Sequence, residues 1–316
     1  LSPDYLCCLD MRQNPHSYSL SFTLQHEIKD FVFEAGYIGN LVRNLGEWNY
    51  NLNQMRPEAM GPLATQLDRP FPQYNNVIQI SVPDKTMTYH ALVVKAEKRY
   101  SGGLSFVSNF TWSKHLGNRE GRFNVYDRKS ARGPAWNSRR LRFVVAGLYE
   151  VPFGVDRKFL NSGAAATVLG GWNMTASFIG SSGIPLNFMA SPNLTNSFGG
   201  NSRANLIGNP KGPETTDKWF NDGAFEHPGE FKFGNAGVGI LEGPGSVDVD
   251  LSLTKDFAFG ESMKVRFTAD FFNIVNKANF NNPSTNICPA SAPCTTGLIT
   301  AAQYGRRTQL GLQFLF

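Results

Sequence analysis

The stretch Met263–Asn273 reads MKVRFTADFFN, and it decides the fold class. Apolar side chains occupy every second position, so that Val265 and Phe267 point away from Lys264 and Arg266. A period of two predicts a β-strand with one apolar and one polar face. If the polar face met lipid, each basic side chain would cost about 2–4 kcal/mol at the bilayer midplane. If such a strand lay in a membrane, the apolar face would therefore be the one toward lipid.

Eight other stretches alternate in the same way, and helical periodicity is almost missing from the chain. These stretches are 17–28, 30–40, 90–100, 102–114, 141–151, 170–180, 247–257 and 306–316. Strands of soluble sheets usually have about five or six residues, whereas a tilted strand of about ten crosses a bilayer. Only 141–151 is less regular, because Val144, Ala146 and Leu148 would point inward, where contact with a plug would cover them.

The connectors between these stretches alternate strictly between short and long. The short ones are EIKD, RYSGG, PFGVDRKFLNSG and FAFGES, and the long ones cover about 41–87, 114–138, 181–245 and 275–305. Outer-membrane barrels place tight turns in the periplasm and long loops outside. We therefore predict an all-β fold: an antiparallel transmembrane β-barrel segment of about nine long strands. The weaker strands NNVIQISV and PLNFMA would be hairpin arms or strand extensions above the membrane.

The same alternation predicts the topology. The last strand follows a long loop, so Phe316 would lie at the periplasmic rim and residues 1–15 outside the cell. An odd strand count leaves an open sheet edge, and each unpaired backbone group in lipid costs several kcal/mol. We therefore expect residues 1–316 to be the C-terminal portion of a larger barrel domain, with the signal peptide and the other strands on a missing part.

Composition excludes several classes of protein. Charged residues are 17% of the chain and the net charge is +5, without the basic stripe that would indicate nucleic-acid binding. No apolar run is long enough for a transmembrane helix. The N-terminal LSPDYLCCLD lacks the basic start and apolar core of a signal peptide.

The four cysteines indicate a disulfide rather than a metal site. Cys288 and Cys294 bracket the proline-rich PASAP, and a loop disulfide there would mean an oxidising compartment. Cys7 and Cys8 are adjacent, which disfavours a bond between them. No further ligands at zinc-binding spacing lie nearby, so we predict no metal and no cofactor.

Each apparent catalytic motif in the sequence lacks the structural context that its chemistry requires. We therefore predict that the chain is not an enzyme. Ser252 and Lys255 fit S-x-x-K, but their spacing in a strand puts them on opposite faces. The glycine-rich GNAGVGILEGPG lacks the strand-to-helix context of a phosphate loop. The histidines have no metal-binding or triad partners in the sequence.

Two long connectors contain candidate ligand contacts. The first is basic, and the second is aromatic, with the sequence TTDKWFNDGAFEHPGEF. The candidate residues are Arg119, Arg122, Arg128, Arg132, Trp136, Trp219, Phe220 and Phe225. The arginines would bind an anionic substrate, or would belong to a solvated loop that contacts lipopolysaccharide. The aromatic rings would stack on a ligand, or would pack the loop onto itself.

Several phrases in a shared order resemble one family. They are YHALVVKAEKRYSGGLSFVSNFTWSK, RRLRFVVAGLYEVPFG, GGWNMTASFIGSSGIPLNF, KWFNDGAF, FGNAGVGILEGPGSVDVDLSLTKDF and VRFTADFFNIVNKANFNNP. With GYIGN near the start, they are similar to the barrel of Oar-like TonB-dependent transporters. The resemblance covers the chain from about residue 14 to Phe316.

The resemblance implies a 22-stranded outer-membrane barrel, of which this chain would supply the last nine or so strands. An N-terminal plug would close the lumen, and the inner-membrane TonB complex would supply energy through an N-terminal box. Plug, box and carboxypeptidase-regulatory-like domain would lie outside this chain. The substrate would be large, such as a peptide, a protein or an oligosaccharide. The alternatives are a passive porin or structural barrel and, less favoured, a secreted β-sandwich adhesin or carbohydrate-binding module.

The final strand, RRTQLGLQFLF, fits this interpretation. Its lipid face would consist of Leu310, Leu312, Phe314 and Phe316. A terminal Phe resembles the signal that the barrel-assembly machinery reads. The expected partners are thus outer-membrane lipid and lipopolysaccharide, the TonB complex and the assembly machinery, and no nucleic acid.

Overall fold

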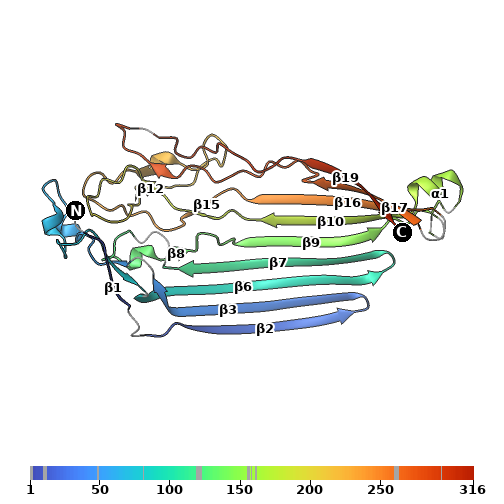
Figure 1. The fold of residues 1–316 in the computed structure, drawn as a ribbon, viewed down its shortest axis with the longest axis horizontal. Helices are drawn as coiled ribbons and strands as arrows, with labels where there is room; N and C mark the ends of the chain where they lie inside the picture. Colours follow the sequence, from blue (N-terminus) through green and yellow to red (C-terminus); the bar gives the residue numbers. More distant parts are fainter. Residues whose placement is uncertain are drawn as a thin grey trace.

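Nine long strands form one continuous antiparallel meander (Figure 1). The computed structural model describes residues 3–9, 13–47, 50–80, 82–118, 123–154, 157, 159–160, 162–259, 263–292 and 294–316. The long strands are β2 (His16–Ile28), β3 (Phe31–Glu47), β6 (Val82–Ser101), β7 (Leu104–Gly117), β9 (Leu141–Glu150), β10 (Trp172–Ser181), β16 (Ser246–Phe259), β17 (Met263–Phe272) and β19 (Arg307–Leu315). Each strand pairs with its neighbour in this order, so the nine predicted strands are confirmed.

β3 and β6 extend furthest beyond the stretches that the alternation predicts. β3 runs on to Glu47 and β6 begins at Val82, and the two stay paired through two register shifts. Their extra residues lie on the long-loop side. The sequence missed them because Pro83, Asp84 and Lys85 interrupt the apolar alternation there.

One end of the sheet holds the tight connections. Gly102 and Gly103 join β6 to β7 with φ of +61° and +80°, the left-handed values that a type I′ hairpin turn requires of both central residues. Lys29 and Asp30 join β2 to β3. The connector from β9 to β10 is longer than predicted, because it contains a helix, α1 (Gly163–Leu169).

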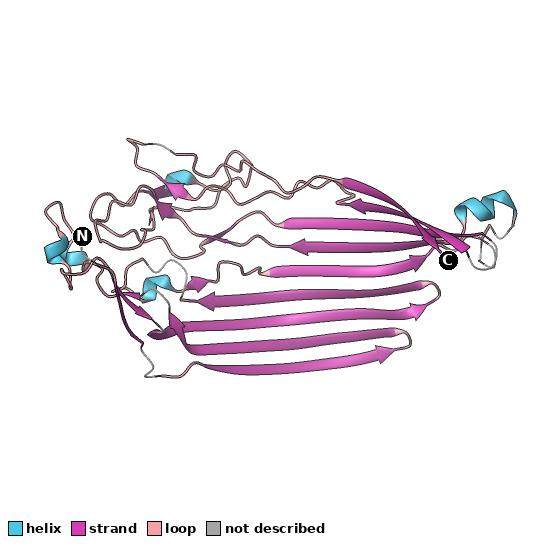
Figure 2. Ribbon diagram, viewed as in Figure 1, coloured by secondary structure: helices cyan, strands magenta, loops and turns pink. Residues whose placement is uncertain are grey.

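The opposite end holds the long loops and their short elements (Figure 2). These are β1 (Tyr5–Leu9), β4 (Tyr50–Asn51), η1 (Pro57–Ala59), η2 (Gln66–Asp68), β5 (Val77–Ile80), η3 (Lys129–Ala131), β8 (Gly133–Pro134), β11 (Pro185–Leu186), β12 (Met189–Ala190), β13 (Asn205–Leu206), η4 (Asp222–Ala224), β14 (Phe225–Glu226), β15 (Leu241–Glu242) and β18 (Asn286–Ile287). The N-terminus lies at this loop end and the C-terminus at the turn end (Figure 1). The predicted separation of short and long connectors is therefore present.

Cross-strand register sorts the side chains into an apolar face and a polar face. Leu253 is opposite Ala269, for example, while Asp256 is opposite Arg266 and forms an ion pair with it at 2.7 Å. The apolar face includes Tyr18, Leu20, Phe22, Leu24, Phe33, Tyr37, Leu92, Val94, Phe106, Trp112, Phe143, Phe178, Leu253, Val265, Phe267, Leu312 and Phe314. The polar face includes Ser19, Thr23, Gln25, Glu34, Lys95, Asn109, Thr175, Ser177, Asp250, Ser252, Thr254, Arg266, Thr268, Asp270 and Gln313.

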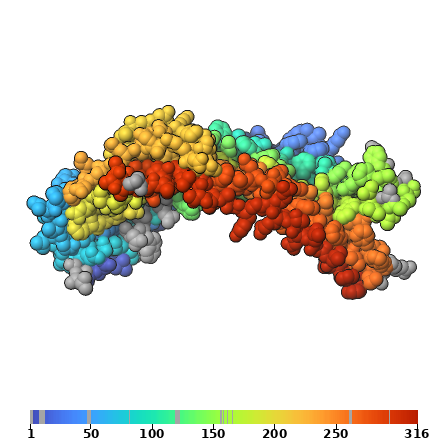
Figure 3. Space-filling view, turned by 90° about the horizontal axis from the view of Figure 1, so that it is seen from above, coloured from blue at the N-terminus to red at the C-terminus, as the bar shows by residue number. Residues whose placement is uncertain are grey.

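The sheet leaves many large apolar side chains exposed, although α1 covers Lys255 and loops meet the apolar face near the long-loop end. All 13 residues of β2 are exposed, including Phe22 and Leu24. Seen edge-on, the molecule is a curved slab (Figure 3). A soluble sheet buries its apolar face against another layer. This sheet leaves that face open, which is what a lipid-facing surface requires.

The packed hydrophobic core lies in the loops instead. It consists of Leu186, Phe188, Ala204, Phe220, Ala224, Phe225, Ala236 and Ile287. At its centre the ring of Phe188 stacks on that of Phe225, with 4.1 Å between centroids, and meets Phe220 edge-on at 4.8 Å. Segments from two long loops, 182–245 and 273–306, thus form one folded unit at the loop end.

No helix in the described part of the chain is long and apolar enough to cross a membrane.

Candidate functional site

The described part of the basic loop after β7 is held by contacts to β6. Arg119 and Arg122 lie outside the described residues. Arg128 forms an ion pair with Asp84 at 2.5 Å, and Arg132 donates to the Thr86 hydroxyl at 3.3 Å. Both contacts hold the loop against the extension of β6. Trp136, in contrast, is 54% exposed. A role of these residues in ligand binding stays a prediction.

The aromatic candidates of the second loop belong to the loop core. Phe220 is fully buried and Phe225 is 6% exposed. Trp219 packs against the same core, and its indole nitrogen donates to the carbonyl oxygen of Glu242 at 3.0 Å. In this structure the two Phe rings offer almost no surface to a ligand. Their packing corresponds to the alternative in which the loop folds onto itself.

The two downstream cysteines are joined. Cys288 and Cys294 form a disulfide with Cα atoms 5.8 Å apart, directly after β18. The bond closes a small loop beside Ile287, which belongs to the loop core. It therefore reinforces the unit of packed loops.

The S-x-x-K pair does not form a site. Ser252 lies in the register of the polar face, and Lys255 lies in that of the apolar face. The Lys255 ammonium is bound to backbone carbonyls of α1, including that of Val168 at 3.0 Å. Among the described residues no group of His, Cys, Asp or Glu could hold a metal ion.

Electrostatic ties also connect the loops. Arg203 is 6% exposed and donates to the carbonyl oxygen of Ser130 at 2.6 Å, and its burial lowers the pKa of the guanidinium. A hydrogen bond from Lys218, at 2.6 Å, lowers the pKa of the Asp222 carboxyl. These contacts stabilise the loop end of the protein.

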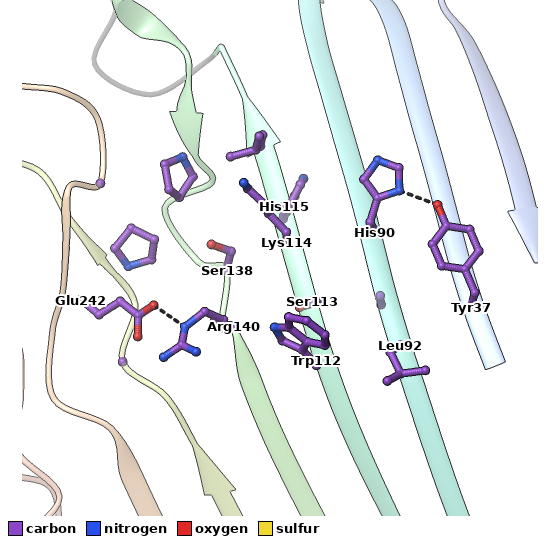
Figure 4. A pocket seen from close by; sticks show the side chains of 16 residues that line it. Tyr37, His90, Leu92, Trp112, Ser113, Lys114, His115, Ser138, Arg140 and Glu242 are labelled. Atoms are coloured by element: carbon purple, nitrogen blue, oxygen red, sulfur yellow. Dashed lines mark hydrogen bonds and ion pairs between the residues drawn. The ribbon is translucent and has the colours of Figure 1, made fainter. Parts of the chain in front are cut away.

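A cavity of about 530 Å³ lies where the apolar face meets the loops (Figure 4). Tyr37, Leu92 and Trp112 are cross-strand neighbours that form its floor. Pro134 and Pro185 contribute to its loop-side wall. The sequence did not predict this cavity.

Two polar pairs border this cavity, with Tyr37 and His90 on one side and Arg140 and Glu242 on the other (Figure 4). The hydroxyl of Tyr37 is 2.6 Å from Nδ1 of His90, and Nε of Arg140 donates to the Glu242 carboxylate at 3.0 Å (Figure 4). Lys114 is the direct neighbour of His90 and contacts no partner among the described residues. The one sequence signal was that His90 and Lys114 interrupt the apolar alternation near the loop ends of their strands.

The apolar face, the separated turns and loops and the open edges together describe part of a barrel wall. A protein family described as outer membrane beta barrel domain matches residues 9–309. The chain belongs to this family. No curated protein matches the sequence. The outer-membrane location expected from the strand pattern is confirmed.

A solved transporter structure shares part of its fold with this outer-membrane barrel chain. The outer membrane transporter YddB from Escherichia coli is 10% identical, with a TM-score of 0.51 over 100% of this chain and 34% of YddB. The copper transporter OprC is 11% identical, with a TM-score of 0.42 over 97% of this chain and 32% of OprC. The chain thus spans about a third of the length of these proteins.

Membership of the family assigns the two faces. Outer-membrane barrels turn an apolar band about 25 Å tall toward lipid and a polar face toward the lumen. Phe22, Leu92 and Phe314 therefore face lipid, whereas Glu34, Asp250 and Arg266 face the lumen. The cavity with Trp112 and Lys114 opens on the lipid side.

Proposed function

We propose that this chain forms part of the barrel wall and the outer loops of a TonB-dependent transporter for a large substrate, such as a peptide, a protein or an oligosaccharide. The observation that carries the proposal is the open sheet: β2 and β19 each pair with one neighbour within the described residues. In lipid those edges must be paired, so the complete barrel has more strands. Its wall is proposed to be the C-terminal part of a 22-stranded barrel.

The character of the lumen face supports this proposal. Glu34, Lys95, Asp250 and Arg266 require water or a polar plug as their neighbour. Val144, Ala146 and Leu148 share that face, and a plug would cover them. The folded loop unit, with its disulfide, is suited to capture a substrate outside the cell. No catalytic role is proposed for the chain.

Conductance of the complete protein in a planar bilayer distinguishes a TonB-dependent transporter from a passive porin. A barrel closed by a plug should show no steady current, whereas a passive porin should conduct at once. In a second assay, the complete protein should bind the periplasmic domain of TonB. A steady open channel together with no binding of that domain would replace the proposal with a passive porin.

A further inference from the structure

We propose that the cavity between the apolar face and the loops binds a phosphorylated, acylated lipid of the outer leaflet. Residues of β3, β6 and β7 form its floor, and the segments around Arg140 and Glu242 form its charged rim. The site is separate from any transport path, because it opens on the lipid side of the wall. The proposal rests on the outer-membrane location and not on transport.

The height of the site matches the edge of the membrane. β7 begins after its turn at Leu104, and Lys114 is ten residues further along. At about 3.3 Å per residue this is about 33 Å of strand, or about 25 Å of height at a tilt of about 40°. Lys114 therefore lies at the upper limit of the apolar band, and Trp112 lies just below it, within reach of acyl chains.

The floor of the cavity offers apolar contact. Trp112 is 56% exposed and Leu92 is 40% exposed, so both present free surface to an acyl chain. Tyr37 has its hydroxyl directed along the strand over Gly39, where an added Cβ would be 2.9 Å from the hydroxyl oxygen. The missing side chain of Gly39 thus leaves room for the Tyr37 ring to reach His90. The hydrogen bond between Tyr37 and His90 holds this ring in place without a ligand.

The rim offers positive charge to a phosphate. Lys114 has no ion-pair partner in the described chain. Arg140 is paired with Glu242 through Nε alone, so its two terminal amino groups remain available as donors. With Lys114 and Arg140 positive and Glu242 negative, the rim carries one net positive charge. In a lipid of this kind the acyl chain would contact the apolar floor of the cavity, and the headgroup phosphate would contact the positively charged rim.

The test measures lipid binding to the complete protein, purified from outer membranes in neutral detergent. The probe is bis-phosphorylated lipid A, with its dephosphorylated form and inorganic phosphate as comparisons, and native mass spectrometry reads the bound fraction. Lys114→Gln should weaken lipid A binding by about tenfold, the loss of one charge-assisted contact. Trp112→Ala should weaken both lipid forms. Since both side chains are exposed, the melting temperature should stay unchanged.

Lys232→Gln is the matched control, because it removes the same charge from an exposed loop position. It should leave lipid A binding unchanged. The proposal is overturned if Lys114→Gln binds lipid A as the parent protein does, or if the dephosphorylated lipid binds equally well. It is also overturned if inorganic phosphate, at the same phosphate concentration as the lipid, displaces lipid A. The site would then recognise a free anion. All measurements are made without TonB, so failure of the transport proposal leaves this test intact.

Discussion

The ammonium group of Lys255 on β16 donates a hydrogen bond of 3.0 Å to the carbonyl oxygen of Val168, near the C-terminal end of α1. It also bonds the carbonyl of Thr167 and lies 5.7 Å from the ring centroid of Trp172. Lys255 stands in the lipid-facing register, where a bare charge would cost about 2–4 kcal/mol at the midplane. At the turn end, α1 supplies the acceptors, and Lys255 is only 4% exposed. Cations are stabilised at helix C-termini, where carbonyls lack partners.

Lys255→Met should loosen α1 without unfolding the barrel. The Thr167 and Val168 carbonyls would lose their donor, at about 1.5–3 kcal/mol for hydrogen bonds from a charged group. Proteolysis within 151–171 should accelerate, while the heat-dependent shift in gel mobility stays that of the parent protein. Lys264→Met, on the polar face of β17, is the control. Equal cleavage of the two variants would show that Lys255 does not hold α1.

Phe220→Ala should unfold the loop unit locally. Removing a fully buried Phe from the centre of a core costs about 3–5 kcal/mol. Limited proteolysis should then cut between residues 182 and 245 while the barrel remains intact. Trp136→Ala, at a half-exposed position, should leave the cleavage pattern unchanged. A Phe220→Ala protein with parental protease resistance would mean that the ring does not support the core.

Reduction of Cys288–Cys294 should weaken the same unit. For a loop this small, loss of the crosslink should destabilise it by about 2 kcal/mol. Mass spectrometry of the protein under denaturing, non-reducing conditions should show the peptide with its disulfide intact. A double Cys288→Ser, Cys294→Ser variant should show faster cleavage near residue 290. Free thiols at Cys288 and Cys294 in the untreated protein would contradict the bond.

Acid should weaken the contact between Asp222 and Lys218. Because the folded state lowers the pKa of Asp222, the contribution is complete above the ordinary carboxyl value of 3.8 and disappears as pH falls through the lower folded value. Both side chains are about half exposed, so the contribution is below about 1 kcal/mol. Between pH 7 and pH 3, the melting temperature of the loop unit should fall slightly more in the parent protein than in Asp222→Asn. If the melting temperatures of the two proteins fell equally with pH, the contact between Asp222 and Lys218 would not contribute to stability.

Phe316→Ser in the complete protein should lower the amount of protein in the outer membrane. The side chain is 95% exposed among the described residues, so the substitution removes almost no contact within this chain. A parental melting temperature of the protein that still reaches the membrane would assign the loss to recognition by the assembly machinery and not to stability. Gln313→Ser, on the lumen-facing side of β19, is the control. Unchanged assembly of Phe316→Ser would reject the signal proposed for Leu310, Leu312, Phe314 and Phe316.

The sequence by itself determined the strands and their faces. Alternation in MKVRFTADFFN or RRTQLGLQFLF is a local property, and a register shift by one residue would turn every apolar side chain inward. Pairs such as Leu253 with Ala269 and Asp256 with Arg266 follow from it. Connector lengths then placed loops and turns at opposite ends, because consecutive antiparallel strands must alternate in direction.

Only the tertiary structure decided how the irregular segments pack. Phe188, Phe220 and Phe225 are far apart in sequence or separated by turns without periodicity, so no local pattern showed that they share one core. Lys255 could not be matched to Val168, which is 87 residues away, because α1 is too short to have a helical signature. The cavity with Tyr37, Trp112 and Arg140 arises where three strands meet two loops. Such contacts depend on the path of the whole chain, whereas the strand pattern depends only on each residue and its neighbours.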